Sequence, residues 1–273
     1  MSDHDLSGFE RDTVTLAGKA RTVFRAGSGP AVIVLAEVPG ISPPVLRFAE
    51  RVAAIGCTAV VPHLFGIPGR DVNPDAHGRF GTVSYLARTM VPLCVSKEFT
   101  LFATGRTSPV VAWLRELAAH EHARCGGPGV GVVGMCLTGG FALAMAVDDA
   151  VIAPVLSQPS LPTPLTRAAR GTVDLSPADL DAVKRRCSAG ELSVLGLRFA
   201  GDRISPPERF AFLRRELGDA FTAVELPDSA ANPDALLSPH SVLTEHLIDR
   251  PGEPTLAAVD QVLDLFRAKL LTT

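Results

Sequence analysis

The sequence predicts an α/β fold with a mainly parallel central sheet and helices on both faces. Three mainly apolar segments, Ala31–Ala36, Cys57–Val61 and Val151–Leu156, have the length and composition of buried strands. Segments with helical spacing lie between such runs, as in Pro43–Ile55, which stops at Gly56. Strands that alternate with helices are typical of a parallel sheet with helices packed on its two faces.

The other elements follow in chain order by the same reasoning. Residues 13–24 alternate around Gly18 and predict an N-terminal hairpin. A helix begins at Ser108–Pro109 and leads to the apolar run from Gly131. The later segments are predicted, in order, as a helix over Pro177–Arg186, a strand over Ser193–Phe199, a helix over Pro206–Leu217, a strand over Thr222–Leu226 and a helix over Thr255–Leu270.

Length and charge restrict the class of protein. The chain has 273 residues, of which 47% are hydrophobic and 20% charged, so it can bury one large core. We expect a single domain over residues 1–273, with irregular pocket segments near 64–105 and 157–190. The net charge is -3 and Lys and Arg form no block, which argues against nucleic acid or an anionic membrane as partner. A small organic substrate is the simpler expectation.

The cysteines suggest neither a disulfide framework nor a zinc site, because their number is odd and no CxxC spacing occurs. The five are Cys57, Cys94, Cys125, Cys136 and Cys187. The first residues are polar and acidic, and no apolar run is long enough to span a bilayer, so we expect a cytoplasmic protein. We also expect a monomer or homodimer that needs no cofactor and no metal.

The run Gly131–Met135 ends in Cys136 and then opens into small and apolar residues that begin a helix. A nucleophile on a sharp turn from strand to helix is the elbow of the α/β-hydrolase fold, whose usual signature has glycine two positions either side. Gly134 matches the first glycine. The helix start favours a thiolate at Cys136, and the Leu137 amide supplies half of an oxyanion hole. The alternative is that Cys136 is a small buried hydrophobe at the end of a core strand.

The second glycine of the elbow signature is replaced in this chain by Thr138. Its side chain must therefore find room in the turn, or cap the following helix through its hydroxyl.

In this fold the nucleophile is followed along the chain by an acid and then by a histidine, each on a loop after a later strand. Asp202 follows the strand Ser193–Phe199 and precedes a helix, which places it at the sheet edge where ligands gather. We interpret Asp202 as the acid of a triad. The alternative is a turn residue or a helix cap.

Two histidines follow Asp202. His240 lies at the end of a loop after the last strand, where a base can reach the nucleophile, and we favour it as the base. His246 falls in a segment that we expect to be helical, and we expect it to be solvated. The earlier histidines are in the wrong order and are expected to be surface or packing residues.

These residues resemble the dienelactone hydrolases, thiol members of the α/β-hydrolase fold, over most of the chain from about Val32. The most specific elements are Gly134–Leu137, Gly201–Asp202 and Ala36–Gly40. The resemblance implies a Cys136, Asp202, His240 triad. It also implies that Glu37 contacts the resting thiol and is displaced when an anionic substrate binds; a loop carboxylate that caps the next helix is the alternative.

The implied reaction is hydrolysis of a small ester or lactone through a thioester on Cys136, with the amides of Leu137 and of the loop near Val38 holding the oxyanion. Family members that cleave dienelactone hold its carboxylate with arginines, and Arg79, Arg106 and Arg203 are candidates here. Two other functions stay open. One is a thiol-redox protein with Cys94 or Cys57 as resolving cysteine, and the other is a non-catalytic binding module on a hydrolase scaffold.

Overall fold

The computed structural model of the chain describes residues 6–71, 84, 85, 89, 108–161, 170–173 and 175–272. Within these ranges eight strands form one sheet, in the order β1-β2-β4-β3-β5-β6-β7-β8. Their bounds are β1 Glu10–Leu16, β2 Lys19–Gly27, β3 Ala31–Leu35, β4 Thr58–Pro62, β5 Val130–Met135, β6 Val151–Ser157, β7 Val194–Phe199 and β8 Phe221–Leu226. Strands β4, β3, β5, β6, β7 and β8 are parallel, and the hairpin β1-β2 joins them antiparallel through β4. The prediction of a mainly parallel sheet is confirmed.

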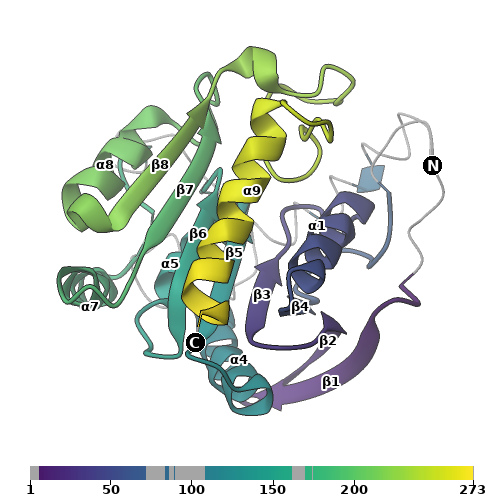
Figure 1. The fold of residues 1–273 in the computed structure, drawn as a ribbon, viewed down its shortest axis with the longest axis vertical. Coiled ribbons are helices and arrows are strands. Elements are labelled where there is room, and N and C mark those ends of the chain that lie inside the picture. Colours follow the sequence, from purple (N-terminus) through teal and green to yellow (C-terminus); the bar gives the residue numbers. More distant parts are fainter. Residues whose placement is uncertain are drawn as a thin grey trace.

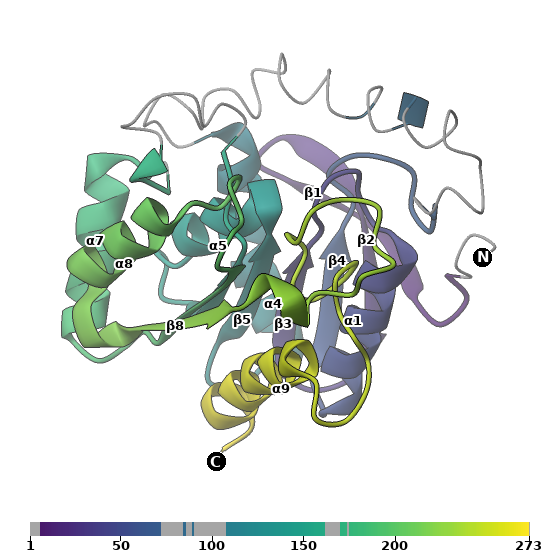
Figure 2. The ribbon, with the colours of Figure 1, turned by 90° about the horizontal axis from the view of Figure 1, so that it is seen from above.

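Helices cover both faces of this sheet, as expected. The helices are α1 Pro43–Ala54, α4 Pro109–Cys125, α5 Gly139–Met145, α7 Pro177–Ser188, α8 Pro207–Leu217 and α9 Pro254–Phe266. Five of them have proline in the first turn. Proline lacks a backbone N–H, and at this position an N–H would have no hydrogen-bond partner within the helix. Helices α1 and α9 lie in front of the sheet in Figure 1, and Figure 2 shows α5, α7 and α8 on its other side.

The alternation of side chains along β3 explains why it reads as one apolar run. All five of its residues are buried. Ile33 packs in the cluster that contains Trp113 of α4, whereas the next residue, Val34, packs in the cluster that contains Phe48 of α1. A strand with a helix layer on each side needs apolar residues at every position.

The predicted element bounds agree with the structure to within a few residues. The hairpin expected over residues 13–24 is β1 and β2, and the C-terminal helix is α9 followed by a π-helical turn over Arg267–Leu271. Most of the segment 64–105 lies outside the described residues. In the described part of the chain, no helix is both long and apolar enough to cross a membrane.

Candidate active site

Polar residues follow the C-terminal ends of neighbouring parallel strands, which meet at one edge of the sheet. Glu37 follows β3, Cys136 follows β5, Ser160 follows β6, Asp202 follows β7 and His240 lies in the long loop after β8. The sequence predicted four of these five positions. Ser160 was not predicted.

Cys136 sits on a strained turn. Its φ is +54°, in the left-handed region that residues with a side chain seldom adopt, and it opens a short 3-10 turn over Cys136–Thr138 before α5 begins. A Cβ on Gly134 would lie 2.1 Å from the carbonyl oxygen of Thr138. The turn therefore requires glycine at position 134, as the sequence predicted. The amide of Leu137 precedes the first hydrogen bond of the turn and is not used within it.

Thr138 finds room in the elbow and makes no side-chain cap to α5. Its side chain is fully buried, and its Oγ1 accepts the N–H of Met135 at 2.9 Å. The same hydroxyl lies 2.9 Å from the carbonyl oxygen of Met135 and 3.0 Å from that of Leu35, and its one hydrogen can be donated to either. Threonine in place of glycine thus ties the elbow to the end of β3.

Asp202 and His240 are hydrogen-bonded to each other. Nδ1 of His240 lies 2.7 Å from Oδ2 of Asp202, while Oδ1 of Asp202 accepts the amides of Ile204 and Ser205 at 2.9 and 3.2 Å. Burial raises the pKa of Asp202, but the bond and charge of His240 and the two amides outweigh it and lower that pKa below its usual value. Asp202 is therefore an acceptor, and Nδ1 of His240 carries the proton.

The second nitrogen of His240, Nε2, is available to act as a base. Nε2 is buried and has no partner in hydrogen-bond geometry among the described residues. Burial lowers the pKa of His240, whereas the charge of Cys136 and hydrogen bonding to Asp202 and to Cys136 raise it well above its usual value. The sulfur of Cys136 thus lies close to the ring, although its contact with Nε2 is outside ideal hydrogen-bond geometry.

The hydrogen-bond partner of the Cys136 sulfur is Ser160. Sγ of Cys136 lies 3.0 Å from Oγ of Ser160, and the N–H of Ser160 donates to the carbonyl oxygen of Cys136 at 2.9 Å. The loop is pressed onto the elbow, because a Cβ on Gly139 would lie 2.7 Å from Cα of Pro159. This close approach explains the glycine that follows Thr138.

Glu37 has different partners from those that the family resemblance implies. It is buried and accepts hydrogen bonds from Oγ of Ser241 at 2.7 Å, from Nε2 of Gln158 at 3.2 Å and from Oγ1 of Thr244. Within the described residues it makes no hydrogen bond to Cys136. Donors from the loops after β6 and β8 occupy the carboxylate, so it braces the histidine loop instead of holding the thiol.

Gln158 is a second brace that sequence reasoning missed. It is fully buried with φ of +35°, an unusual conformation for a residue with a side chain. Its Nε2 donates to Glu37, and its Oε1 accepts the N–H of Val242 at 3.3 Å. The only signal in the sequence was a glutamine directly after an apolar strand.

His246 was predicted wrongly as a solvated residue on a helix. The segment around it forms turns, and the side chain is only 2% exposed. Its Nδ1 accepts the N–H of Ser241 at 3.1 Å, so Nε2 carries the proton and donates to the carbonyl oxygen of Leu237 at 3.0 Å. Burial lowers the pKa of His246, which keeps the ring neutral in this role.

The arginine candidates are placed only in part. Arg203 is exposed directly after Asp202, whereas Arg79 and Arg106 lie outside the described residues. Two buried arginines that were not predicted bind backbone carbonyls of the site loops. Arg198 donates to Ser205 at 2.8 Å, and Arg209 donates to Pro159 at 2.6 Å. They fix the loops that carry Asp202 and Ser160.

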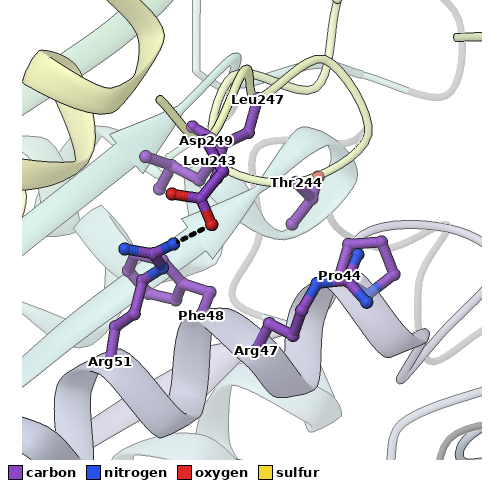
Figure 3. Close-up of a pocket in the computed structure, with 8 residues that line it drawn as sticks. All are labelled: Pro44, Arg47, Phe48, Arg51, Leu243, Thr244, Leu247 and Asp249. Carbon is purple, nitrogen blue, oxygen red and sulfur yellow. Dashed lines mark hydrogen bonds and ion pairs between the residues drawn. The ribbon is translucent and has the colours of Figure 1, made fainter. Parts of the chain in front are cut away.

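A small pocket lies beside the site, between α1 and the turns that follow His240 (Figure 3). It is lined by Pro44, Arg47, Phe48, Arg51, Leu243, Thr244, Leu247 and Asp249. Arg51 and Asp249 form an ion pair across it, with 2.5 Å between Nη2 and Oδ2. Cys136, Asp202 and His240 do not line this pocket. Thr244, which lines the pocket, also bonds to Glu37.

No group of three or more histidine, cysteine, aspartate or glutamate side chains in the described ranges could hold a metal ion. The chemistry that the described residues offer is that of a thiol beside an imidazole, with a carboxylate behind the ring.

Comparisons with known proteins identify the family of the chain. A model of the dienelactone hydrolase family matches residues 17–184, a stretch that includes Glu37 and Cys136 but ends before Asp202 and His240. No curated protein sequence matches the chain significantly.

Similar solved structures have the same fold. A protein from Klebsiella pneumoniae that is provisionally assigned as a dienelactone hydrolase has a TM-score of 0.60 at 18% identity, over 94% of this chain and 97% of that one. A dienelactone hydrolase-like promiscuous phosphotriesterase from metagenomic libraries has a TM-score of 0.60 at 17% identity, over 97% and 100%. A cold-adapted esterase from an Arctic intertidal metagenomic library has a TM-score of 0.52 at 14% identity, over 94% and 92%. Because the family model covers more than half of the sequence, the chain belongs to the dienelactone hydrolase family of carboxylic ester hydrolases.

Proposed function

We propose that the chain hydrolyses a small ester or lactone with Cys136 as nucleophile, His240 as base and Asp202 as the residue that orients the base. The observation that carries the proposal is the 2.7 Å hydrogen bond between Asp202 and Nδ1 of His240. It fixes the ring so that Nε2 is the basic nitrogen, and the charge of Cys136 raises the pKa of this ring. This is the geometry that a general base needs toward a thiol.

The reaction proceeds in two halves. Nε2 of His240 takes the proton of the Cys136 thiol, and the sulfur attacks the carbonyl carbon of the ester. The tetrahedral intermediate collapses to a thioester, and His240 returns the proton to the leaving alkoxide. Water then gives a proton to His240 and attacks the thioester, which releases the acid and the thiol.

The oxyanion of each tetrahedral intermediate needs two donors. The amide of Leu137 is one, because it precedes the first hydrogen bond of the elbow turn. The second is expected in the loop after β3, near Val38. The contact of the Thr138 hydroxyl with the carbonyl oxygen of Ala36, at 3.3 Å, supports this choice, since Ala36 begins that loop.

Turnover of p-nitrophenyl acetate tests the proposal. Cys136→Ala abolishes turnover, and intact-mass measurement of the wild-type protein after rapid mixing detects an added acetyl group that the variant does not acquire. Cys125→Ala is the matched control, because Cys125 ends α4 at the opposite edge of the sheet, and it keeps wild-type turnover. Unchanged turnover in Cys136→Ala would remove the proposal.

A thiol-redox function is the first alternative, and the positions of the cysteines count against it. Cys57 directly precedes β4, whereas Cys136 follows β5. Because β4, β3 and β5 are parallel, the two cysteines lie at opposite ends of these strands. A strand of this length is roughly 20 Å long, and a disulfide needs Cα atoms within about 7 Å. Cys125 and Cys187 also lie at the ends of helices that precede strands. Cys94 is outside the described residues, so intact mass after peroxide, with and without Cys94, completes the test.

A non-catalytic binding module is the second alternative. It predicts no thiol-dependent burst with p-nitrophenyl esters, whereas the proposed hydrolase gives a burst or steady turnover. Recognition of an anionic group by Arg79, Arg106 or Arg203, the cytoplasmic location and the monomeric or homodimeric state stay predictions.

A further inference from the structure

We propose that Ser160 is a further catalytic residue, whose hydroxyl holds the resting thiol of Cys136 and then donates a hydrogen bond to the thiolate. The inference rests on the proposed cysteine mechanism and adds to it a residue that touches the reacting atom. It starts from the 3.0 Å contact between Sγ of Cys136 and Oγ of Ser160.

The side-chain hydroxyl of Ser160 makes its hydrogen bond with the sulfur of Cys136. Ser160 is 5% exposed, and among the described residues the sulfur is the hydrogen-bond partner of its side chain. A buried hydroxyl without a partner is costly, so this contact is the one that the fold provides for it. The carboxylate of Glu37, the other candidate partner of the thiol, is occupied by donors from elsewhere.

The backbone holds the two side chains at this separation. The N–H of Ser160 donates to the carbonyl oxygen of Cys136, and Arg209 anchors the neighbouring carbonyl of Pro159. Both contacts are made by main-chain atoms of the Ser160 loop, the N–H of Ser160 and the carbonyl oxygen of Pro159. They persist when the hydroxyl is removed, so a substitution of Ser160 can change the chemistry without displacing the loop.

A hydroxyl suits both states of the sulfur. It has one hydrogen to donate and lone pairs that accept, so it can accept from the S–H group at rest. When Nε2 of His240 takes the thiol proton, the Ser160 hydroxyl rotates and donates to the negative sulfur. Ser160 keeps its own proton throughout, and the single proton that moves passes from sulfur to nitrogen. Hydrogen bonds to a charged acceptor are stronger than neutral ones, so the contact favours the thiolate.

This arrangement has a consequence for the substrate. A neutral hydroxyl does not have to be displaced by an anionic substrate before the thiol can ionise. We therefore expect Cys136 to react without substrate present, and uncharged esters to be turned over without an added carboxylate.

Alkylation of Cys136 by iodoacetamide, followed by peptide mass measurement from pH 5 to 10 without substrate, tests the role of Ser160. We expect Ser160→Ala to lower the alkylation rate at pH 7 about tenfold and to move the pH of half-maximal rate up by about one unit. Ser160→Thr, which keeps the hydroxyl, restores most of the rate. Ser160→Gly also lacks the hydroxyl and repeats the measurement if the alanine variant does not fold.

The matched control is Thr58→Val. It removes another buried hydroxyl, which donates to the carbonyl oxygen of Gly29 at 2.7 Å, at the start of β4 and thus at the far edge of the sheet. It leaves the alkylation profile of Cys136 unchanged. A wild-type profile in both Ser160→Ala and Ser160→Gly overturns the role of Ser160, while the cysteine mechanism stands as long as Cys136→Ala is inactive. Ester turnover by Cys136→Ala overturns the mechanism itself, whatever Ser160 does.

Discussion

The imidazole of His246 accepts a hydrogen bond from the backbone N–H of Ser241, the residue that follows His240, at 3.1 Å. Its other nitrogen donates to the carbonyl oxygen of Leu237, three residues before His240. The ring is also packed edge-on against Phe199 at the end of β7, with 5.9 Å between ring centroids. A second, buried histidine thus holds the main chain on both sides of the candidate base.

Replacement of His246 by phenylalanine should separate positioning from packing. The variant keeps an aromatic ring against Phe199 but loses both hydrogen bonds to the histidine loop. We expect kcat to fall about tenfold with little change in KM, because each lost bond costs on the order of 1 kcal/mol and loosens His240. His246→Gln, which can restore one bond, should recover part of kcat. An unchanged kcat in His246→Phe would show that the loop does not need this clamp.

The strands and helices were predictable because each has a local cause. The apolar run of β3 follows from burial on both faces, and the start of α4 follows from Ser108, whose Oγ accepts the N–H of Val111 at 3.4 Å. The partnership of Asp202 and His240 was predictable from chain order, since each follows a later strand of a parallel sheet.

The braces of the site were not predictable, because their roles depend on loops that meet only in the folded chain. Gln158 and Ser160 follow β6, and their partners lie in the loop after β8 and in the elbow. The sequence around His246 predicts a helix. In the folded chain, side-chain bonds to the backbone hold this segment in turns instead.

Asp202→Asn should lower kcat at least hundredfold with a smaller effect on KM, because a neutral amide stabilises the charged ring less than a carboxylate does and its NH2 group favours the wrong tautomer of His240. The bond from Asp202 also raises the pKa of His240, so the ring should titrate at lower pH in the variant. Proton–nitrogen correlation spectra of the histidine rings measure this directly.

Asp228→Asn is the control for this loop, because Oδ1 of Asp228 accepts the N–H of Gly201 at 2.8 Å and makes no bond to His240. It should retain wild-type kcat and the wild-type titration of His240. Equal losses of activity in both variants would point to general loosening of the loop and against an orienting role for Asp202.

Thr138→Val should destabilise the fold by about 1–3 kcal/mol, because it removes the acceptor of the buried Met135 N–H and the donor to the carbonyl of Leu35. The side chains have nearly the same shape, so packing is preserved. Thr138→Ser keeps the hydroxyl and should lose less. Urea unfolding of the three proteins measures the difference, and a valine variant as stable as the wild type would contradict the proposed tether.

Glu245 should make the protein less stable as the pH rises toward 7. Burial and the charges of Glu37 and Asp71 together raise the pKa of this carboxyl to about 7, against the opposing charge of Arg47. In the unfolded chain the group loses its proton near its usual value of 4.5. Between these two values the folded state holds a proton that the unfolded state does not, so the free energy of unfolding falls as the pH increases through this range.

Glu245→Gln isolates this contribution, because glutamine resembles the protonated acid at every pH. The difference in the free energy of unfolding between the variant and the wild type should grow by about 2 kcal/mol in favour of the variant between pH 5 and pH 8. Urea unfolding at both pH values measures it, and taking the difference cancels the titration of Asp202 and His240, which both proteins share. If Glu245→Gln instead gives a difference that is the same at both pH values, Glu245 is ionised at neutral pH in the folded protein and the predicted proton uptake is absent.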